Sequence, residues 1–428
     1  MSGFSIDHGG AISVDPDALR GVARRTDAVA TRCEVAATSL AGAHRTIVDT
    51  PGFSAQVDTI GLWAAAQAAS DLLADCQEVA TSTMLMADAY EYVELMTRAE
   101  ALELTDAAEA RELRRRMEVM AAADGQVPEL AERLIREWER ERFAGLEPPY
   151  PASLIFAPMV WAAASLGMSP LFGTVRPGAS LSGTADAVTV APVATSSPKT
   201  PPTSVAGSLR RMPTAPGAQV AVEKYSYADG RTRFVAYIVG TQAASAGGSQ
   251  PWDMKSNAEL YRGQTSASYQ ATLDALAAAG ARPGDEVDVI SHSQSGMIAA
   301  YLSTGSAFDV QVQIAAGSPV QVMGGEGQTI VGLAHSDDPV PALAGGGVPG
   351  GVGSPDSFTA TREATPDAGL DYTPLGAHGL DTYIETAEMV DASDDPRVEE
   401  LGAFWDELAR AETIERTEYR AERVEEPR

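Results

Sequence analysis

The sequence predicts an α/β fold with a mainly parallel sheet, preceded by an all-α domain built as a helical hairpin. Apolar residues recur at steps of three, four and seven over residues 15–48 and about 57–96, which predicts two long helices. After residue 215 the pattern changes to short apolar runs that alternate with helical segments, as in an α/β domain with a parallel sheet. The 428 residues are enough for two or three such units.

Residues 1–100 form the predicted hairpin. Asp15-Pro16 supplies a helix cap followed by a proline in the first turn, and Thr50-Pro51-Gly52 breaks the helical pattern. Two long helices joined by a short turn fold back on each other as an antiparallel pair. Cys33 and Cys76 lie on the apolar stripes at similar distances from this turn, so we expect them to be neighbours. They form a disulfide in an oxidising compartment, or remain two thiols in a reducing one.

A helical extension with an apolar segment is predicted for residues 101–175. Its helices, over 105–144, carry dense charges that we interpret as a solvated surface. Residues 148–175 contain no charged side chain and are long enough to span a bilayer, but Pro158 and Pro170 interrupt them, which argues against a membrane span. A buried element, a lid over an acyl-binding pocket and a membrane contact are the alternatives for this segment.

Three further segments complete the predicted organisation. Residues 176–215 are expected to be a linker, because the stretch APVATSSPKTPPTS is rich in Pro, Ser and Thr. Residues 216–392 form the predicted α/β domain, and residues 393–428 a charged C-terminal helix. Within the α/β domain we expect a strand pair over 219–240, strands at 286–290, 309–314 and 329–334, and helices near 265–280 and after 294 and 380.

The composition argues against several classes of function. The chain has 59 acidic and 31 basic side chains, a formal net charge of −28, whereas a nucleic-acid partner requires clustered cations. Two cysteines are too few for a thiolate zinc site, and we expect no metal and no cofactor. The first ten residues have neither the basic nor the apolar stretch of a cleavable signal peptide.

The strongest chemical signal is the segment Ser291-His292-Ser293-Gln294-Ser295, which follows the predicted strand 286–290 and opens a helix. A serine nucleophile at such a strand-to-helix turn needs small residues two positions before and two after it, because the backbone is strained and tightly packed there. Ser291 and Ser295 meet this requirement around Ser293. The alternative is a polar loop whose serines only cap the helix.

A serine hydroxyl becomes nucleophilic when a histidine accepts its proton and a carboxylate orients that histidine. Of the three histidines in the α/β region, His292 lies inside the turn itself and His335 ends a strand beside two acids. His378, on a loop just before a helix, is therefore the predicted base. The acid is expected after a late strand, where Asp338 is our first choice and Asp337 the alternative.

Three motifs, Ser-His-Ser-Gln-Ser-Gly, Asp-Pro-Val-Pro and Gly-Ala-His, resemble the lipase/esterase branch of the α/β-hydrolase family over residues 216–392. The resemblance implies an α/β-hydrolase fold and a serine hydrolase that cleaves carboxylic esters or lipids through an acyl-enzyme. Its catalytic triad would be Ser293, Asp338 and His378. Acyl transfer to an alcohol by the same residues is the alternative, and a non-catalytic partner-binding protein is a further one.

The resemblance also implies the position of an oxyanion hole. In that family two backbone amides bind the oxyanion, one just after the nucleophile and one after an early strand. Here these would be the amide of Gln294 and one from the turn at Thr241 and Gln242.

The N-terminal hairpin resembles the Trp-x-Gly helical-hairpin substrates of type VII secretion, which leave actinobacteria without a cleaved signal. Tyr90 and Glu94 supply the Tyr-x-x-x-Glu pattern of that export signal late in the second helix, whereas Pro51-Gly52-Phe53 stands where the Trp-x-Gly turn would be. The resemblance implies a secreted or cell-surface protein and a partner in the secretion system. A hairpin that binds another helical hairpin in the cytoplasm is the alternative.

Overall fold

The computed structural model describes residues 4–7, 16–103, 106–141, 173–325, 327–344, 354–365 and 376–424. The chain divides into two compact units, each made from segments distant in sequence. A helical unit contains residues 14–96 and 111–135, and an α/β unit contains residues 1–13, 97–110 and 136–428. The predicted boundary at residue 100 is therefore wrong, because the chain crosses between the two units more than once.

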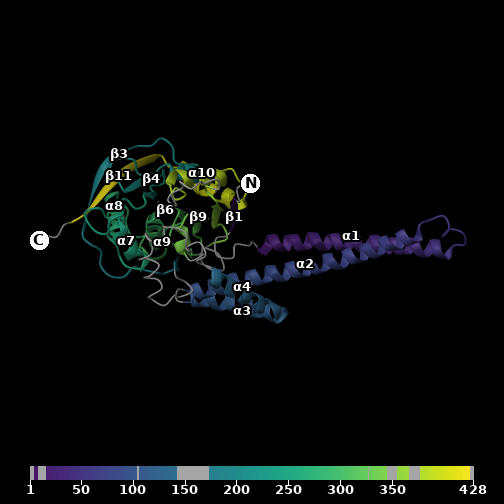
Figure 1. The fold of residues 1–428 in the computed structure, drawn as a ribbon. Coiled ribbons are helices and arrows are strands. Elements are labelled where there is room, and N and C mark those ends of the chain that lie inside the picture. Colours follow the sequence, from purple (N-terminus) through teal and green to yellow (C-terminus); the bar gives the residue numbers. More distant parts are fainter. Residues whose placement is uncertain are drawn as a thin grey trace. The chain divides into compact units, whose positions relative to one another are not determined.

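Four helices build the N-terminal part of the chain: α1 (Pro16–Asp49), α2 (Thr59–Leu102), α3 (Ala107–Ala123) and α4 (Gln126–Glu141). Helices α1 and α2 lie side by side as an antiparallel hairpin (Figure 1). Gly52 takes a φ of +83° in the turn between them, a conformation open to glycine at little cost. At the start of α2, Asp58 accepts a hydrogen bond from Gly61 N at 2.9 Å.

Ion pairs connect three helices of the helical unit. Arg20 of α1 donates to Asp88 of α2 at 2.8 Å and also to Glu91, and Arg116 of α3 donates to Glu91 at 2.8 Å. Arg20 and Glu91 are partly buried, so solvent screens this pair less than it screens pairs on an open surface, whereas Arg116 is exposed. Glu91 thereby links α1 to α3 through α2.

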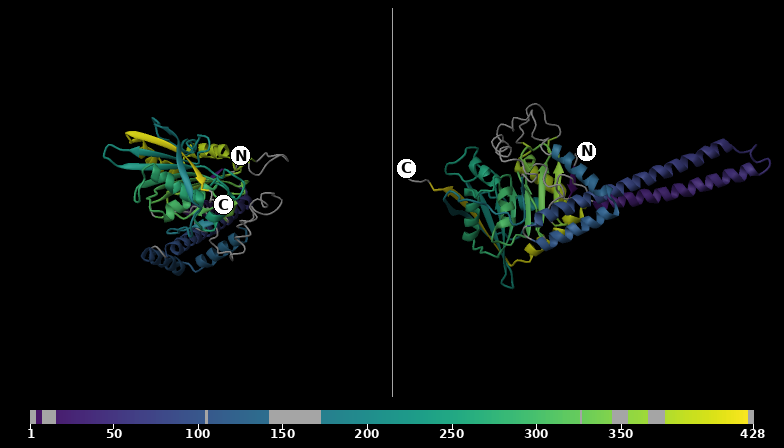
Figure 2. Two further views of the ribbon diagram at one scale, coloured as in Figure 1. Left: turned by 90° about the vertical axis from the view of Figure 1, so that its left-hand side faces the viewer. Right: turned by 90° about the horizontal axis from the view of Figure 1, so that it is seen from below.

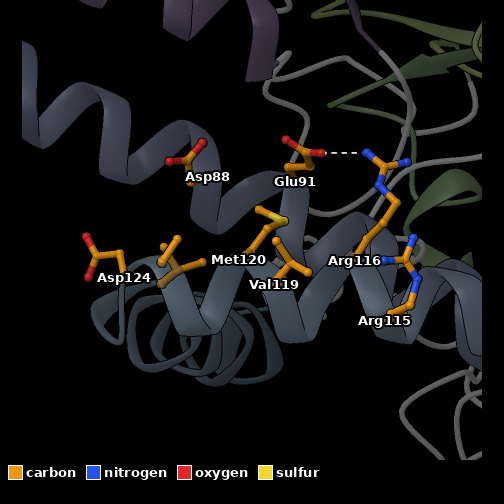
Figure 3. A pocket seen from close by; sticks show the side chains of 9 residues that line it. Asp88, Glu91, Arg115, Arg116, Val119, Met120 and Asp124 are labelled. Carbon is orange, nitrogen blue, oxygen red and sulfur yellow. Dashed lines mark hydrogen bonds and ion pairs between the residues drawn. The ribbon is translucent and has the colours of Figure 1, made fainter.

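A cavity of about 360 Å³ lies beside these ion pairs, between α2, α3 and the start of α4 (Figure 3). Charged groups from α2 and α3, among them Asp88 and Arg116, line it together with apolar Val119 and Met120 of α3. All the residues that line it belong to the helical unit. It therefore contains none of the residues that the sequence predicts to be catalytic.

A mixed sheet of nine strands organises the described part of the α/β unit, in the order β1-β10-β9-β7-β6-β5-β4-β11-β3. Strands β5, β6, β7, β9 and β10 are parallel neighbours, while β4, β11 and β3 continue the sheet antiparallel on one side and β1 on the other. The strands are β1 (Ser5–Asp7), β3 (Val188–Ser196), β4 (Val220–Ser226), β5 (Thr232–Ile238), β6 (Glu286–His292), β7 (Val312–Ala316), β9 (Thr329–His335), β10 (Phe358–Arg362) and β11 (Thr413–Arg423).

Helices cover both faces of this sheet. Along β5, Phe234 and Ala236 belong to one buried cluster and Val235 and Tyr237 to another, because successive strand residues point to opposite faces. The first cluster includes residues of α7 (Met254–Tyr261), α8 (Ala267–Ala278) and α9 (Ser295–Gly305). The second includes residues of α6 (Val205–Leu209), α10 (Leu380–Asp391) and α12 (Gly402–Ala409).

A small second sheet pairs β2 (Thr174–Val175) with β8 (Gln321–Val322). The predicted α/β class is confirmed.

The expectation of a linker at 176–215 is wrong. Strand β3 lies within it and pairs along its length with β11 (Figure 2). Helix α6 packs into the core. The register shifts at Pro192, where Glu418 faces Ala194 and Tyr419 faces Pro192. Proline lacks an N–H donor, but an edge strand with a bulge tolerates it. The proline-rich composition therefore concealed a strand at the edge of the sheet.

The expectation of a charged helix over 393–428 is also wrong in its second half. Short helices α11 (Pro396–Glu400) and α12 are followed by β11, which lies between β4 and β3. Arg416 and Glu418 of β11 are buried, and Arg416 pairs with both Glu418 and the fully buried Glu223. Because charged side chains occupy inward positions, the strand lacks the apolar alternation that normally identifies one.

Most of the apolar segment 148–175 lies outside the described residues, so its expected role as lid, core element or membrane contact stays a prediction. Its described end forms β2. Among the helices of the described ranges, none combines the length and the apolar character needed to cross a bilayer.

Cys33 and Cys76 are free thiols that contact each other across the α1–α2 hairpin. Partial burial and the neighbouring Cys33 thiol raise the pKa of Cys76 above its ordinary value. The two side chains therefore lie at the same height on facing helices.

Mild oxidation of the purified protein should close an intrachain Cys33–Cys76 disulfide and raise the melting temperature, because the crosslink restricts the unfolded chain. Mass spectrometry of the intact chain should find the loss of two hydrogens, and Cys33→Ser, oxidised in parallel, should show neither effect. Two thiols that stay reduced, or that link only separate chains, would contradict this expectation.

Candidate functional site

The turn that follows β6 has an unusual backbone conformation. Ser293 has a φ of +59°, and in the described ranges it alone among residues other than glycine has a positive φ. Such a conformation costs free energy in an L-residue and persists where the surroundings enforce it. A Cβ on Gly240 would lie 2.8 Å from the Cβ of Ser293, and one on Gly296 would lie 2.3 Å from Ser318 Oγ. Neighbouring backbone therefore packs closely against this turn, as expected from the sequence.

The two serines that flank Ser293 are buried and their hydroxyls are engaged. Ser291 Oγ donates to Ile314 O at 3.2 Å. Ser295 Oγ donates to Ile238 O at 2.7 Å and accepts from His292 N at 2.9 Å. Both hydroxyls hold the turn against neighbouring strands, which leaves Ser293 as the serine of this turn whose hydroxyl faces a base.

The structure brings Ser293, His378 and Asp338 together in one hydrogen-bonded chain. His378 Nε2 lies 2.8 Å from Ser293 Oγ, and His378 Nδ1 lies 2.6 Å from Asp338 Oδ2. Asp338 follows β9 and is buried, and its other oxygen accepts from Val340 N at 2.9 Å. A carboxylate held in this way fixes the ring orientation of the histidine and its tautomer.

The alternative acid, Asp337, faces a different part of the molecule. It accepts from Ala364 N at 2.8 Å, from Thr365 N at 3.0 Å and from Thr365 Oγ1 at 2.5 Å. Burial alone would raise the pKa of this carboxyl, but these hydrogen bonds outweigh it and hold the pKa below its ordinary value. Asp337 therefore anchors the chain after β10 and does not contact His378.

Tyr383 on α10 is a contact of Asp338 that the sequence did not reveal. Its hydroxyl donates to Asp338 Oδ2 at 2.6 Å, and its ring stacks on His335 with centroids 3.9 Å apart. Burial and the adjacent carboxylate raise its pKa well above the ordinary value, so the phenol remains a donor. The only signal in the sequence was its place one turn into the helix after His378.

Two further histidines support the loop that carries His378. His292 Nε2 lies 2.9 Å from the carbonyl oxygen of His378, and His335 Nδ1 lies 2.7 Å from that of Ala377. Burial and the nearby His378 lower the pKa of His292 to about 4, so the ring is neutral at pH 7 and donates its Nε2 proton to the carbonyl. Burial likewise lowers the pKa of His335. Neither histidine contacts the Ser293 hydroxyl, and both position backbone of the His378 loop.

Gly317, just after β7, makes room for these rings. Its φ is +62°, and an added Cβ would lie 2.8 Å from the Tyr383 ring and 3.0 Å from His378 Cε1. A side chain here would displace both residues, so glycine is required for steric and conformational reasons.

The predicted oxyanion amides lie in two turns. Gln294 is the N-cap of α9, directly after Ser293, and Thr241 follows β5. Gln242 N donates to Trp252 O at 2.7 Å, which leaves Thr241 as the amide of its turn that can bind a ligand. Within the described residues no group accepts from the amides of Gln294 or Thr241.

Tyr90 and Glu94 are one turn apart on α2, so their side chains share one face of the helix. Both are partly buried, and burial raises the pKa of Tyr90.

Comparison with known proteins gives no relative for this chain: no protein-family model, no curated protein and no solved structure matches it. The arrangement of the side chains therefore has to support the functional argument by itself.

Tyr383→Phe should lower kcat for a carboxylic ester about tenfold, because it removes one hydrogen bond to a buried carboxylate and keeps the ring stacked on His335. Steady-state kinetics on a chromogenic ester measures this, and KM should change little. Tyr227→Phe is the matched control, since the buried Tyr227 hydroxyl has no partner among the described residues. Equal kcat in the two variants would show that the Tyr383 hydroxyl does not support Asp338.

Proposed function

We propose that this chain is a serine hydrolase of the α/β-hydrolase type that cleaves carboxylic esters. The observation that supports the proposal is the continuous chain from Ser293 through His378 to Asp338, built at a turn where the serine has a φ of +59°. The parallel strands β5, β6, β7 and β9 present their carboxyl ends at one edge of the sheet, which is where sites of α/β proteins form. The turn that contains Thr241 follows β5, the turn that contains Gln294 follows β6, and Asp338 follows β9.

The proposed reaction has two steps. His378 Nε2 accepts the proton of Ser293 as Oγ attacks the ester carbonyl, and then gives that proton to the leaving alcohol. Water repeats the sequence on the acyl-enzyme and releases the acid. Asp338 holds the ring of His378 and stabilises the imidazolium that forms in each step. The chemistry needs no group that these side chains and backbone amides do not supply.

The developing negative charge would be bound by the amides of Gln294 and Thr241. Backbone amides in a fixed position stabilise an oxyanion without reorganising when it forms. Their lack of other acceptors among the described residues supports this role.

Ser293→Ala and His378→Ala should each reduce ester turnover at least a thousandfold, because members of such a triad act as a unit. A serine-reactive fluorophosphonate should label the wild-type chain and leave Ser293→Ala unlabelled, as measured by mass spectrometry. Ser291→Ala is the matched control, because it removes a hydroxyl two residues away whose hydrogen bond, among the described residues, is to Ile314 O. Labelling or turnover that persists without Ser293 would refute the proposal.

We infer that the helical hairpin directs export, with Tyr90 and Glu94 as its signal. Their placement on one face of α2 supports this reading. In the native host, the double variant Tyr90→Ala, Glu94→Ala should stay folded and active but remain in the cells, as measured by immunoblotting of cells and medium. Glu100→Ala, an exposed change on the same helix, is the control. Equal release of all three proteins would refute the signal.

A further inference from the structure

The last residue of β11, Arg423, reaches the turn that contains Thr241 through a series of buried contacts. Its side chain is 7% exposed. The guanidinium binds both oxygens of Asp253, with Nη1 2.8 Å from Oδ2 and Nη2 2.9 Å from Oδ1. Such a two-pronged pair fixes direction as well as distance, because the guanidinium is planar and its donors form a rigid fork.

The same guanidinium also holds the loop that precedes Asp253. Nη1 donates to Gly248 O at 3.1 Å and to Gln250 O at 2.7 Å, and Nη2 donates to Ser256 Oγ at 3.0 Å. Residues 241–253 form neither a helix nor a strand, and Gly247 and Gly248 both have positive φ. A loop of this kind has many backbone conformations open to it, so external contacts have to select one.

Asp253 transmits these contacts to the site. It accepts from Gly247 N at 2.6 Å and from Ser256 N at 3.0 Å, where it caps α7. The carbonyl oxygen of the preceding residue, Trp252, accepts from Gln242 N at 2.7 Å. The carbonyl oxygen of Asp253 accepts from Gln294 Nε2 at 3.4 Å. Asp253 and its neighbour Trp252 together therefore contact both turns whose amides we propose to bind the oxyanion.

A second contact joins α7 to the same turn. Asn257 Nδ2 donates to Thr241 Oγ1 at 3.1 Å. Because Asp253 caps the helix that carries Asn257, the orientation of this amide also depends on the carboxylate that Arg423 holds.

We propose that Arg423 is a positioning residue for the oxyanion-binding turn, acting through Asp253. The proposal rests on the function proposed above. Stabilisation by a backbone amide depends on its placement to within a fraction of an ångström, and a shift of about 1 Å in a reacting geometry costs about a hundredfold in rate. Arg423 thus makes the C-terminal strand, remote in sequence from Ser293, a part of the active-site architecture.

The test compares Arg423→Gln and Arg423→Lys with Arg420→Gln, an exposed arginine on the same strand. The backbone amide of Arg423 donates to Ser249 O at 2.8 Å, and a change of side chain does not remove this donor, so we expect β11 to keep a contact with the loop in each variant. For Arg423→Gln we expect kcat on a chromogenic ester to fall about 10- to 100-fold with KM within twofold, because the amides bind the oxyanion mainly in the transition state. Arg423→Lys, which keeps the charge but loses the fork, should recover part of this loss.

A second readout separates positioning from general destabilisation. An alkyl boronic acid forms a tetrahedral adduct on the serine, so its affinity should fall by the same factor as kcat/KM in the Arg423 variants and stay unchanged in Arg420→Gln. Unchanged kcat and boronate affinity in folded Arg423→Gln would overturn the proposal. If Arg423→Gln does not fold, the same two measurements are made on Arg423→Lys. If neither variant folds, the proposal is also overturned. Failure of the proposed function is distinct, because wild-type turnover would then not depend on Ser293.

Discussion

The positive φ of Ser293 is the constraint on which the candidate site depends. Ser293 lies in the turn between β6 and α9, and the residues that follow β5 and β7 approach this turn closely. Gly240, Gly296 and Gly317 stand at the points where a Cβ would collide with the turn or with the residues around it. The strain at one residue is thus sustained by small residues on other elements.

A second layer of order surrounds the imidazole of His378. Its ring contacts Ser293 and Asp338, while its backbone is held by His292 and the carbonyl before it by His335. Burial lowers the pKa of both supporting histidines, which favours their neutral form. The ring and the backbone of His378 are therefore fixed by separate sets of contacts. These contacts give the side chain a defined position although it lies on a loop.

The sequence predicted the local features, and the side chains that the structure brings together around Ser293, better than it predicted the sheet edges. The hairpin helices could be read from periodicity, and Ser293, Asp338 and His378 could be chosen because each follows or precedes a recognisable element in a fixed order. Strand β11 could not be predicted from the sequence, because buried Arg416 and Glu418 stand where apolar residues would normally identify a strand. The contacts of Tyr383 and Arg423 could not be predicted from the sequence for another reason. Their roles depend on partners 45 and 170 residues away, and no local pattern encodes such a pairing.

The pairing of β3 has a consequence for the order of folding. Strand β3 has β11 as its neighbour in the sheet, and Thr189 pairs with Glu422, close to the last described residue. At the opposite edge, Ser5 pairs with Thr361. During synthesis the five parallel strands can associate before β11 has been made. The last of them, β10, is the partner of β1, whereas β3 must stay unpaired until β11 has left the ribosome. The nascent protein therefore carries an unpaired strand until β11 is made, and closure of this edge of the sheet is a late, long-range event whose rate is limited by loop entropy.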